Sequence, residues 1–196
     1  MCAKKSIKAD ILDCARTLFN QESWSAVSLR RIASELKVSD GNLRYHYRTK
    51  EEIVLNLFTA MTTEMAVIIH ESERSLDGLN RNFLKIFRIM YRYRFLFIES
   101  YFIRRSYESY AILFDQLQES RRDLFAEAFE ELRDSGELSS AFSNEQYDKL
   151  FEQLFILSDN WIKYLDGDEA DYVEAQITHY ADLCQALLLP YVVTHN

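Results

Sequence analysis

The chain has 196 residues, of which 48% are apolar, so it can bury a core and is unlike an intrinsically disordered protein. Its four glycines and one proline favour an almost entirely helical structure, because both residues interrupt regular elements. The net charge of -8 is uneven: residues 1–50 hold ten Lys and Arg against five Asp and Glu, and residues 51–196 hold 13 against 26. A basic N-terminal quarter on an acidic body predicts a polyanionic partner for that quarter alone.

The three cysteines are odd in number and lack metal-ligand spacing, so they predict neither a disulfide framework nor a metal site. Cys14 and Cys184 lie at apolar helical positions and are expected to be small buried residues in a reducing cytosol. The first ten residues, MCAKKSIKAD, have no hydrophobic signal region, and we find no apolar run of the roughly 18 residues that a membrane span needs. We therefore expect a cytoplasmic protein with no cofactor and no membrane contact.

Periodic apolar residues predict an all-α fold of about nine helices. The predicted ranges are 6–21, 28–36, 40–47, 50–74, 79–94, 95–105, 107–134, 145–165 and 169–189. The first three should form a unit within residues 1–50, and the others a larger helical body over residues 51–196. Gly78, Gly136 and Gly167 each fall where a helical pattern ends, as is typical of C-cap glycines.

The stretch 28–50, SLRRIASELKVSDGNLRYHYRTK, indicates two short helices joined by a tight turn. Ser28 and Ser39 stand at the expected N-cap positions. In the second helix only Leu43 and Tyr47 are expected to face inward, so most of its surface is left for another task. Two short helices with such a turn form a helix-turn-helix unit, whose second helix enters the major groove of DNA.

The residue types of this unit, about 28–47, suit a contact with double-stranded DNA. Gly41 allows close approach, Asn42 can pair with an adenine edge, and Arg44 can bind guanine or phosphate. The candidate DNA-binding residues are Ser28, Arg30, Ser39, Asp40, Gly41, Asn42, Arg44, Tyr45, His46 and Lys50. The alternatives are a merely solvated polar face and, for Asp40, a first-turn acid that stabilises the helix N-terminus.

These residues carry a family resemblance. SLRRIASELKVSDGNLRYHYRTKEEI, with ILDCARTLFNQESWSAVSL before it, resembles the DNA-binding signature of the TetR family of bacterial transcriptional regulators, and GNLRYHY resembles one of its subgroups. The resemblance covers residues 6–60 and implies a homodimer, a palindromic operator and a small-molecule ligand. Three residues depart from the family pattern: Arg44 stands where Tyr is frequent, Lys37 where Gly often ends the first helix of the motif, and Asp40 adds a negative charge.

The resemblance also implies that the helices over 145–165 and 169–189 pair with a second copy in a four-helix bundle. The candidate dimer residues are Phe151, Leu154, Phe155, Ile177, Tyr180, Cys184 and Leu188. A thick core within one chain is the alternative for the same apolar residues. Residues 51–196 would then form a ligand-binding and dimerisation domain.

A pocket for an apolar or aromatic ligand is implied for the aromatic-rich helices of the body. The candidate ligand residues are Met61, Phe87, Tyr91, Arg94, Tyr101, Tyr110, Phe114 and Trp161. Aromatic residues at helical spacing can equally form a core, and Arg94 can meet a ligand carboxylate or pair with Glu99. The stripe formed by Arg81, Lys85, Arg88 and Arg92 is expected to be solvated or paired with acids.

The function predicted from these features is a ligand-released transcriptional repressor, in which the ligand tilts the helix that begins at Lys50. The alternatives are a ligand-independent regulator or activator and a helical interaction module. An enzyme is disfavoured because none of the four histidines follows an acid by three residues, and the sequence contains neither a phosphate-binding glycine loop nor a nucleophile elbow.

Overall fold

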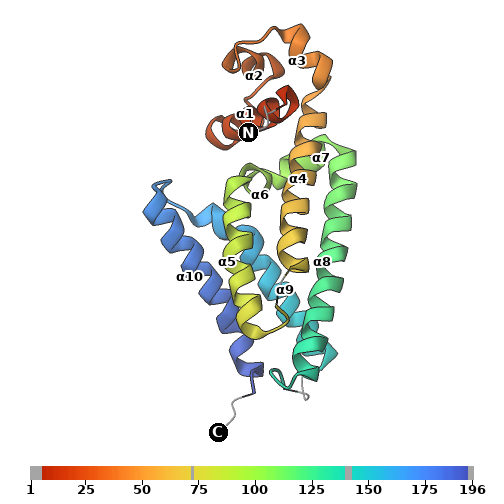
Figure 1. Ribbon diagram of the computed structural model, residues 1–196, viewed down its shortest axis with the longest axis vertical. Helices are drawn as coiled ribbons and strands as arrows, with labels where there is room; N and C mark the ends of the chain where they lie inside the picture. Colours follow the sequence, from red (N-terminus) through yellow and green to blue (C-terminus); the bar gives the residue numbers. More distant parts are fainter. Residues whose placement is uncertain (1–5, 72, 140–142, 194–196) are drawn as a thin grey trace, which may run out of the picture. The chain divides into compact units, whose positions relative to one another are not determined.

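The computed structural model describes residues 6–71, 73–139 and 143–193, and nearly all of these residues are helical (Figure 1). Their ten α-helices and two 3-10 turns confirm the all-α fold. The helices are α1 Ile7–Glu22, α2 Leu29–Glu35, α3 Asp40–His46, α4 Lys50–His70, α5 Leu76–Arg92, α6 Phe95–Ile98, α7 Ser100–Ser106, α8 Glu108–Asp134, α9 Asn144–Asn160 and α10 Ala170–Leu188, with 3-10 turns at Trp161–Tyr164 and Leu189–Tyr191.

The described chain divides into two compact units. The first combines residues up to 63 with residues 93–114, and the second combines 64–92 with the chain from 115 onwards. This division differs from the boundary expected after residue 50, because α4 and α8 each contribute one part to each unit. The first unit therefore contains α6 and α7 as well as the three N-terminal helices.

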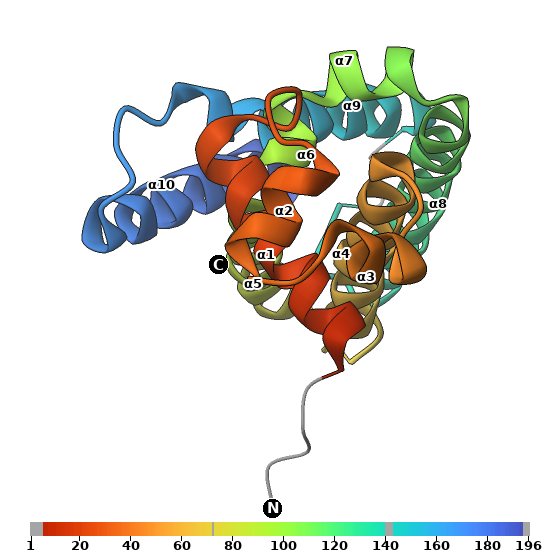
Figure 2. The same ribbon diagram turned by 90° about the horizontal axis from the view of Figure 1, so that it is seen from above.

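The first unit is built around α1, α2 and α3, which lie next to one another in Figure 2. α1 buries Ile11 and Leu18, α2 buries Ile32, and α3 buries Leu43. The first half of α4 adds Ile53, Val54, Leu57, Phe58 and Met61 to the buried residues. A three-helix unit of this size has a marginal core by itself, so the apolar half of α4 supplies burial that the small unit lacks.

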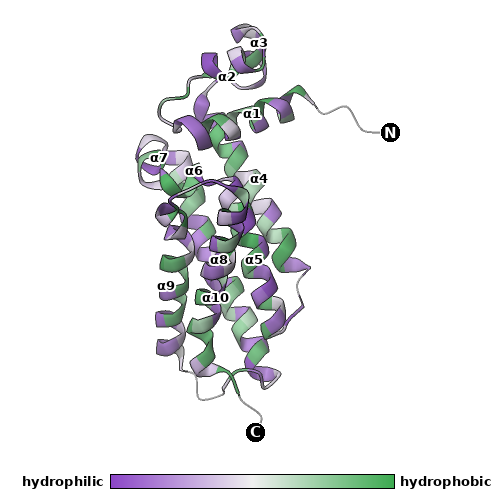
Figure 3. Cartoon of the chain, turned by 90° about the vertical axis from the view of Figure 1, so that its left-hand side faces the viewer, coloured by the Kyte–Doolittle hydropathy of each residue, from purple (hydrophilic) through white to green (hydrophobic). Residues whose placement is uncertain are grey.

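The second unit packs α10 against α5 and α9. Apolar and polar residues alternate around these helices, as the colours of Figure 3 show, so each has a face for the core. Trp161 and Phe87 stack at the centre, with ring centroids 5.3 Å apart. Arg81, Arg88 and Arg92 pair with acids of the same unit, which confirms one of the two expectations for that stripe.

The candidate dimer residues are mostly buried by the chain itself. Of the seven, Phe151, Leu154, Ile177, Cys184 and Leu188 are buried. Because a side chain buried within its own subunit has no surface left for a second copy, the assignment of these five to a dimer interface is wrong. The alternative of an intrachain core describes them correctly.

Several predicted helix ends were also wrong. The predicted helix over 95–105 is broken at Glu99 into α6 and α7, and the one over 145–165 changes to a 3-10 turn after Asn160. Gly78 lies in the first turn of α5, where its N–H donates to the Ser75 hydroxyl, so it is not a C-cap. Gly136 does follow the end of α8 with a φ of +79°.

By length and composition alone, α4 could cross a membrane, and within the described residues it is the one helix that could. The expectation that the chain has no such segment was therefore too strict. A single apolar helix is weak evidence for a membrane span, since core helices of soluble proteins have the same composition. Ile53, Val54, Leu57, Phe58 and Met61 of its first half are buried in the protein, which is 28% of the apolar window.

Candidate DNA-binding interface

The connection between α2 and α3 is fixed by backbone hydrogen bonds. After the last turn of α2, the Lys37 N–H donates to the Ser34 carbonyl at 3.1 Å and the Val38 N–H donates to the Ala33 carbonyl at 3.0 Å. This pair of bonds is the Schellman motif, which requires a positive φ at its central residue. Lys37 meets that requirement with a φ of 55°, although a side chain disfavours this conformation.

Both helices begin at the serines predicted as caps. The Ser28 hydroxyl accepts from the Arg31 N–H at 3.1 Å, and the Ser39 hydroxyl accepts from the Asn42 N–H at 3.1 Å. Each serine thereby satisfies one of the backbone donors that a helix start leaves unpaired. The caps and the Schellman turn together set where α3 starts relative to α2.

The outer surface of α3 is polar and open to solvent. Leu43 and Tyr47 are buried, as predicted, while Asn42, Arg44 and Tyr45 are exposed, the last by 85%. His46 is half-buried and its ring lies edge-on to that of Tyr45, with centroids 5.1 Å apart. The helix therefore contributes little to the core and presents most of its side chains outward.

Gly41 is not required by the fold. It lies on the exposed surface, and a Cβ atom added to it would meet no other atom within 4 Å. Its φ is not positive, so the backbone would accept any common residue. A glycine within a helix is unfavourable by about 0.5–1 kcal/mol relative to alanine, so neither the packing nor the backbone conformation of the chain accounts for Gly41.

Positive charge on this unit is distributed unevenly. Arg30 is exposed and, among the described residues, takes part in no ion pair. Arg31 donates to both Glu22 and Glu35 at 2.7 Å, and these hydrogen bonds raise the pKa of its guanidinium further above its ordinary value. The charge of Arg31 is thus neutralised by two acids of its own unit.

Lys50 is half-buried, and its side chain contacts its own unit. Its ammonium donates to the Trp24 carbonyl at 2.9 Å and lies 4.6 Å from the centroid of the Trp24 ring. Desolvation lowers the pKa of Lys50, although the nearby Glu99 carboxylate acts in the opposite direction. The structure therefore does not present Lys50 as an outward-facing phosphate ligand.

Glu99, at the break between α6 and α7, joins this segment to the end of α1. Its carboxylate accepts from the Trp24 N–H at 2.6 Å and from the Ser23 hydroxyl at 2.8 Å. The side chain of Asn20 accepts from the Phe95 N–H at 3.1 Å. Sequence periodicity could not have found these contacts, because their partners are more than 70 positions apart.

The candidate ligand residues fall in both compact units. Met61, Tyr110, Phe87 and Trp161 are buried, and Tyr91, Arg94 and Phe114 are half-buried. Tyr101 is 64% exposed, so it cannot line an enclosed pocket, and its hydroxyl accepts from Arg105 at 3.1 Å. A surface hollow of about 240 Å³ is lined instead by Asp77, Asn80, Arg81, Leu84, Ala181, Asp182 and Gln185.

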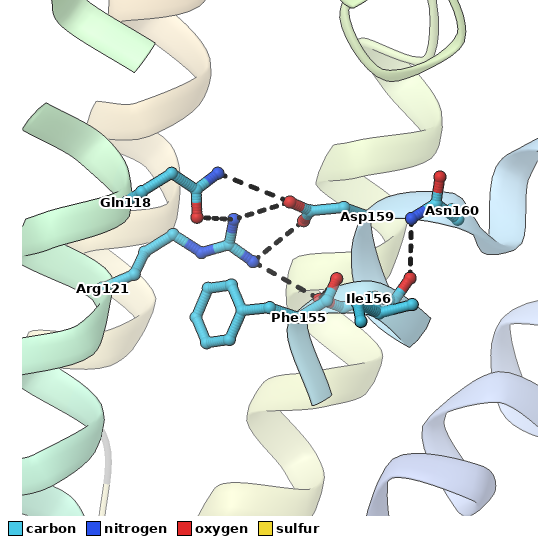
Figure 4. A network of polar contacts seen from close by, with 7 residues as sticks. Gln118, Arg121, Phe155, Ile156, Asp159 and Asn160 are labelled. Carbon is cyan, nitrogen blue, oxygen red and sulfur yellow. Dashed lines mark hydrogen bonds and ion pairs between the residues drawn. The ribbon is translucent and has the colours of Figure 1, made fainter. Parts of the chain in front are cut away.

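A polar network that the sequence did not predict joins α8 to α9 in the second unit (Figure 4). Arg121 donates to both carboxylate oxygens of Asp159, at 3.0 and 3.2 Å, and Gln118 also donates to this acid at 3.4 Å. The guanidinium of Arg121 lies 3.8 Å from the centroid of the Phe155 ring. A planar cation can make both contacts at once, so this network fixes the two helices to each other.

A capped helix, a tight turn and a second helix with an exposed polar surface form a helix-turn-helix unit, which is a common DNA-binding element of transcription regulators. The chain belongs to the TetR family of bacterial transcriptional repressors. The sequence model described as "Bacterial transcriptional repressor" matches residues 52–195, and that described as "Bacterial regulatory proteins, tetR family" matches residues 11–57. Members of this family are DNA-binding transcription regulators and not enzymes, and a bacterial regulator of this kind acts in the cytoplasm.

Two curated relatives share part of the sequence. The negative transcriptional regulator of the biofilm operon icaADBC, IcaR from Staphylococcus epidermidis, is 32% identical over 98 residues, which are 47% of this chain and 52% of IcaR. The transcriptional repressor Rv3405c from Mycobacterium tuberculosis is 30% identical over 84 residues, which are 40% of this chain and 45% of that protein. The chain thus spans about half the length of the curated relatives that it matches.

Solved structures share the fold over almost the whole chain. A TetR-family regulator from Marinobacter aquaeolei VT8 has a TM-score of 0.85 at 18% identity, covering 96% of this chain and 92% of that one. The ketosteroid transcriptional regulator KstR2 of Mycobacterium tuberculosis has a TM-score of 0.71 at 14% identity, with 98% of each chain covered. At this level of identity, the similarity extends to the fold alone.

Proposed function

We propose that the protein is a homodimeric repressor that binds a palindromic operator through α3 of each subunit and leaves it when a small-molecule ligand binds. The observation that carries the DNA-binding part is the outer face of α3, where Gly41, Asn42, Arg44 and Tyr45 are exposed. A helix of the family motif with this surface is suited to base edges in the major groove. We also assign the chain to the GNLRYHY subgroup, on the residues of α3 itself.

Each exposed group has a task that its chemistry suits. Asn42 and Arg44 are the candidates for base contacts, since an amide can pair with adenine and a guanidinium with guanine. Arg30, Tyr45, His46 and the hydroxyl hydrogens of Ser28 and Ser39 are the candidates for phosphate contacts, which fix the position of the helix without reading the sequence.

Negative regulation and the homodimer are supported by separate observations. The relative IcaR is named as a negative regulator. A single helix-turn-helix unit contacts few base pairs, and two units on half-sites one helical turn apart are the usual remedy. In the second unit, Ile156 of α9 is 68% exposed and Leu183 of α10 is also exposed, so these side chains are available for a second copy.

A ligand site in the second unit is supported by Trp161. Its ring stacks on Phe87 and lies 5.6 Å from the Tyr180 ring, and within the described chain its buried indole N–H has no hydrogen-bond partner. An unpaired buried donor costs free energy that a ligand acceptor could recover. We therefore propose an apolar or aromatic ligand that carries at least one hydrogen-bond acceptor.

DNA binding is tested by fluorescence anisotropy with duplexes from the promoter region of the protein's own gene. The wild type should prefer this region over random DNA at moderate salt, and Gly41→Glu or Arg44→Glu should abolish the preference without changing the dimer. Ile112→Glu, which adds the same negative charge as Gly41→Glu at an exposed position away from α3, is the matched control. Equal binding of promoter and random DNA by the wild type would contradict the proposal.

Ligand release is tested in two steps. A panel of aromatic and apolar compounds is first screened by thermal shift, because a compound that binds the folded state raises its melting temperature. Each hit is then titrated into the protein–operator complex. A compound that stabilises the protein and leaves DNA binding unchanged would argue for a ligand-independent regulator.

A further inference from the structure

The recognition helix α3 carries a carboxylate next to its only long cation. Asp40 is the first residue of α3 and Arg44 lies one turn later, with 2.8 Å between Asp40 Oδ2 and Arg44 Nε. Both side chains are accessible, at 38% for Asp40 and 53% for Arg44. The pair therefore lies on the surface that faces DNA in a helix-turn-helix complex, and not in the core.

A negative charge at this position opposes binding to a polyanion. Asp40 is not needed as the cap of α3, because the Ser39 hydroxyl already accepts from the Asn42 N–H. It does stabilise the positive end of a short helix, but Asp40 also repels any phosphate that approaches Arg44. If Asp40 only stabilised α3, its negative charge would weaken binding to every DNA sequence by the same factor.

The contact uses one particular nitrogen of the guanidinium. Asp40 accepts from Nε, while Nη1 points toward the Arg48 carbonyl at 3.4 Å, a weak contact that leaves the end of the side chain available. An arginine held in this way has a restricted direction. Two parallel donors from a guanidinium match the O6 and N7 acceptors of guanine, whereas a phosphate accepts the same cation from many directions.

We propose that Asp40 is a specificity-determining positioning residue: it holds Arg44 in the direction that suits a guanine edge and disfavours the contact of Arg44 with phosphate. The pair then lowers the affinity of the protein for DNA of any sequence. In return it raises the discrimination at one base pair of each half-site. This inference rests on the proposed use of α3 in DNA recognition. The role that it assigns to Asp40 depends on Arg44.

The chain provides a matched control for the charge. Glu35 pairs with Arg31 at 2.7 Å, with the same separation of four residues, but lies on α2. Glu35→Gln removes the same charge from the same unit and breaks the same kind of pair. Any effect of Asp40→Asn that Glu35→Gln does not reproduce therefore belongs to the recognition helix.

The test begins with duplexes that the wild type selects from a randomised DNA pool. Dissociation constants of wild type, Asp40→Asn, Arg44→Ala and the double variant are then measured for a selected duplex, for the same duplex changed at each guanine in turn, and for random DNA. Asp40→Asn should bind random DNA several-fold more tightly. The discrimination at a guanine is the ratio of the dissociation constants of the changed and the selected duplex. At the guanine where Arg44→Ala lowers this ratio, Asp40→Asn should also lower it, by about fivefold or more. In the double variant, the loss at this guanine should equal that of Arg44→Ala alone.

The outcomes separate this inference from the function on which it rests. If the wild type selects no sequence, the proposed function fails. If it selects a sequence and Asp40→Asn changes selected and random binding by the same factor, as Glu35→Gln should, the role of Asp40 in specificity is overturned. Circular dichroism of each variant checks that the total helix content is unchanged, and Asp40→Glu, which keeps the charge, should restore part of the discrimination.

Discussion

Lys37 and Gly136 occupy the same position of the same helix-ending motif in different parts of the chain. Gly136 follows α8 with a φ of +79°, and Lys37 follows α2 with a φ of 55°. After each, the N–H of the next residue donates to the carbonyl five positions back, from Glu137 to Leu132 and from Val38 to Ala33, both at 3.0 Å. The hydrogen bonds are equal, but only glycine adopts this backbone without a steric cost.

Lys37→Gly should therefore stabilise the protein. Relief of the left-handed conformation is worth about 1–2 kcal/mol, and the extra freedom of glycine in the unfolded chain removes about 0.4–1 kcal/mol of this gain. We expect the free energy of unfolding in urea to rise by about 0.5–1 kcal/mol. The reciprocal variant Gly136→Lys should lower it, and a decrease for Lys37→Gly would show that the lysine side chain has a stabilising contact of its own.

Cys184 makes a prediction about alkaline pH. Burial raises the pKa of its thiol from 9.0 to about 12. Above pH 9 the unfolded state loses this proton while the folded state keeps it, so the free energy of unfolding should fall by up to about 1.4 kcal/mol per pH unit until pH 12. Below pH 9 the contribution is constant.

The measurement is urea unfolding at pH 8, 9 and 10 for the wild type and Cys184→Ala. Tyrosines also titrate at high pH, so the informative quantity is the difference between the two proteins, which should shrink as the pH rises. Alkylation of Cys184 in the folded protein at pH 9 should be slow and should accelerate on unfolding. Rapid alkylation in the folded state would contradict burial.

At the scale of elements, one side chain explains why α6 and α7 are separate helices. Glu99 stands between them and directs its carboxylate to Ser23 and Trp24 at the end of α1. Ser23 has a φ of 74°, so the chain turns sharply where it is held. The hydrogen bonds of Glu99 thereby join the α6–α7 segment to the end of α1, in addition to the continuous chain through α4.

Glu99→Ala should weaken this attachment. It leaves the Trp24 N–H without its acceptor, and hydrogen bonds to charged groups contribute about 1.5–3 kcal/mol. Because the site is partly accessible, we expect a loss of about 1–2 kcal/mol in urea unfolding followed by circular dichroism. Glu35→Gln, which removes an exposed ion pair, should cost about 0.5 kcal/mol or less. Equal losses would show that Glu99 contributes no more than a surface pair.

The sequence predicted the elements better than their ends and partners. Periodicity and the serine caps gave the starts of α2 and α3, because those signals are local. The breaks at Glu99 and after Asn160 escaped prediction, since the former depends on Ser23 and Trp24, far away in the sequence. The dimer residues were misassigned for a similar reason: an apolar stripe on α9 or α10 looks the same whether its partner is another helix of the chain or a second copy.

Local signals also predicted single side chains of the site better than contacts with distant residues. The spacing of Leu43 and Tyr47 correctly marked the inner face of α3. The contact of the Lys50 ammonium with the Trp24 carbonyl could not be predicted, because nothing in the sequence around Lys50 indicates it. The pairing of Asp40 with Arg44, four residues apart, could have been read from the sequence, since this spacing brings opposite charges together on a helix.

At the scale of the whole molecule, the surface left free by the core limits where a second copy can bind. If the exposed part of α9 forms the dimer interface, Ile156→Glu should shift the mass in light scattering from twice 23.2 kDa to 23.2 kDa. Ile112 of α8, which is 52% exposed and belongs to the first unit, provides the control. Ile112→Glu should leave the dimer intact, and a dimer that survives Ile156→Glu must use another surface.

The two tryptophans of the chain fall one in each compact unit. Trp24 lies beneath the Lys50 ammonium in the first unit, and Trp161 stacks on Phe87 in the second. Their intrinsic fluorescence therefore forms a built-in pair of optical reporters. Trp161→Phe leaves an emission that reports only on the DNA-binding unit, and Trp24→Phe leaves one that reports only on the other. Stopped-flow emission of Trp161→Phe would follow the DNA-binding unit when DNA is added, and that of Trp24→Phe, which keeps the Trp161 indole, would follow the second unit when an effector is added.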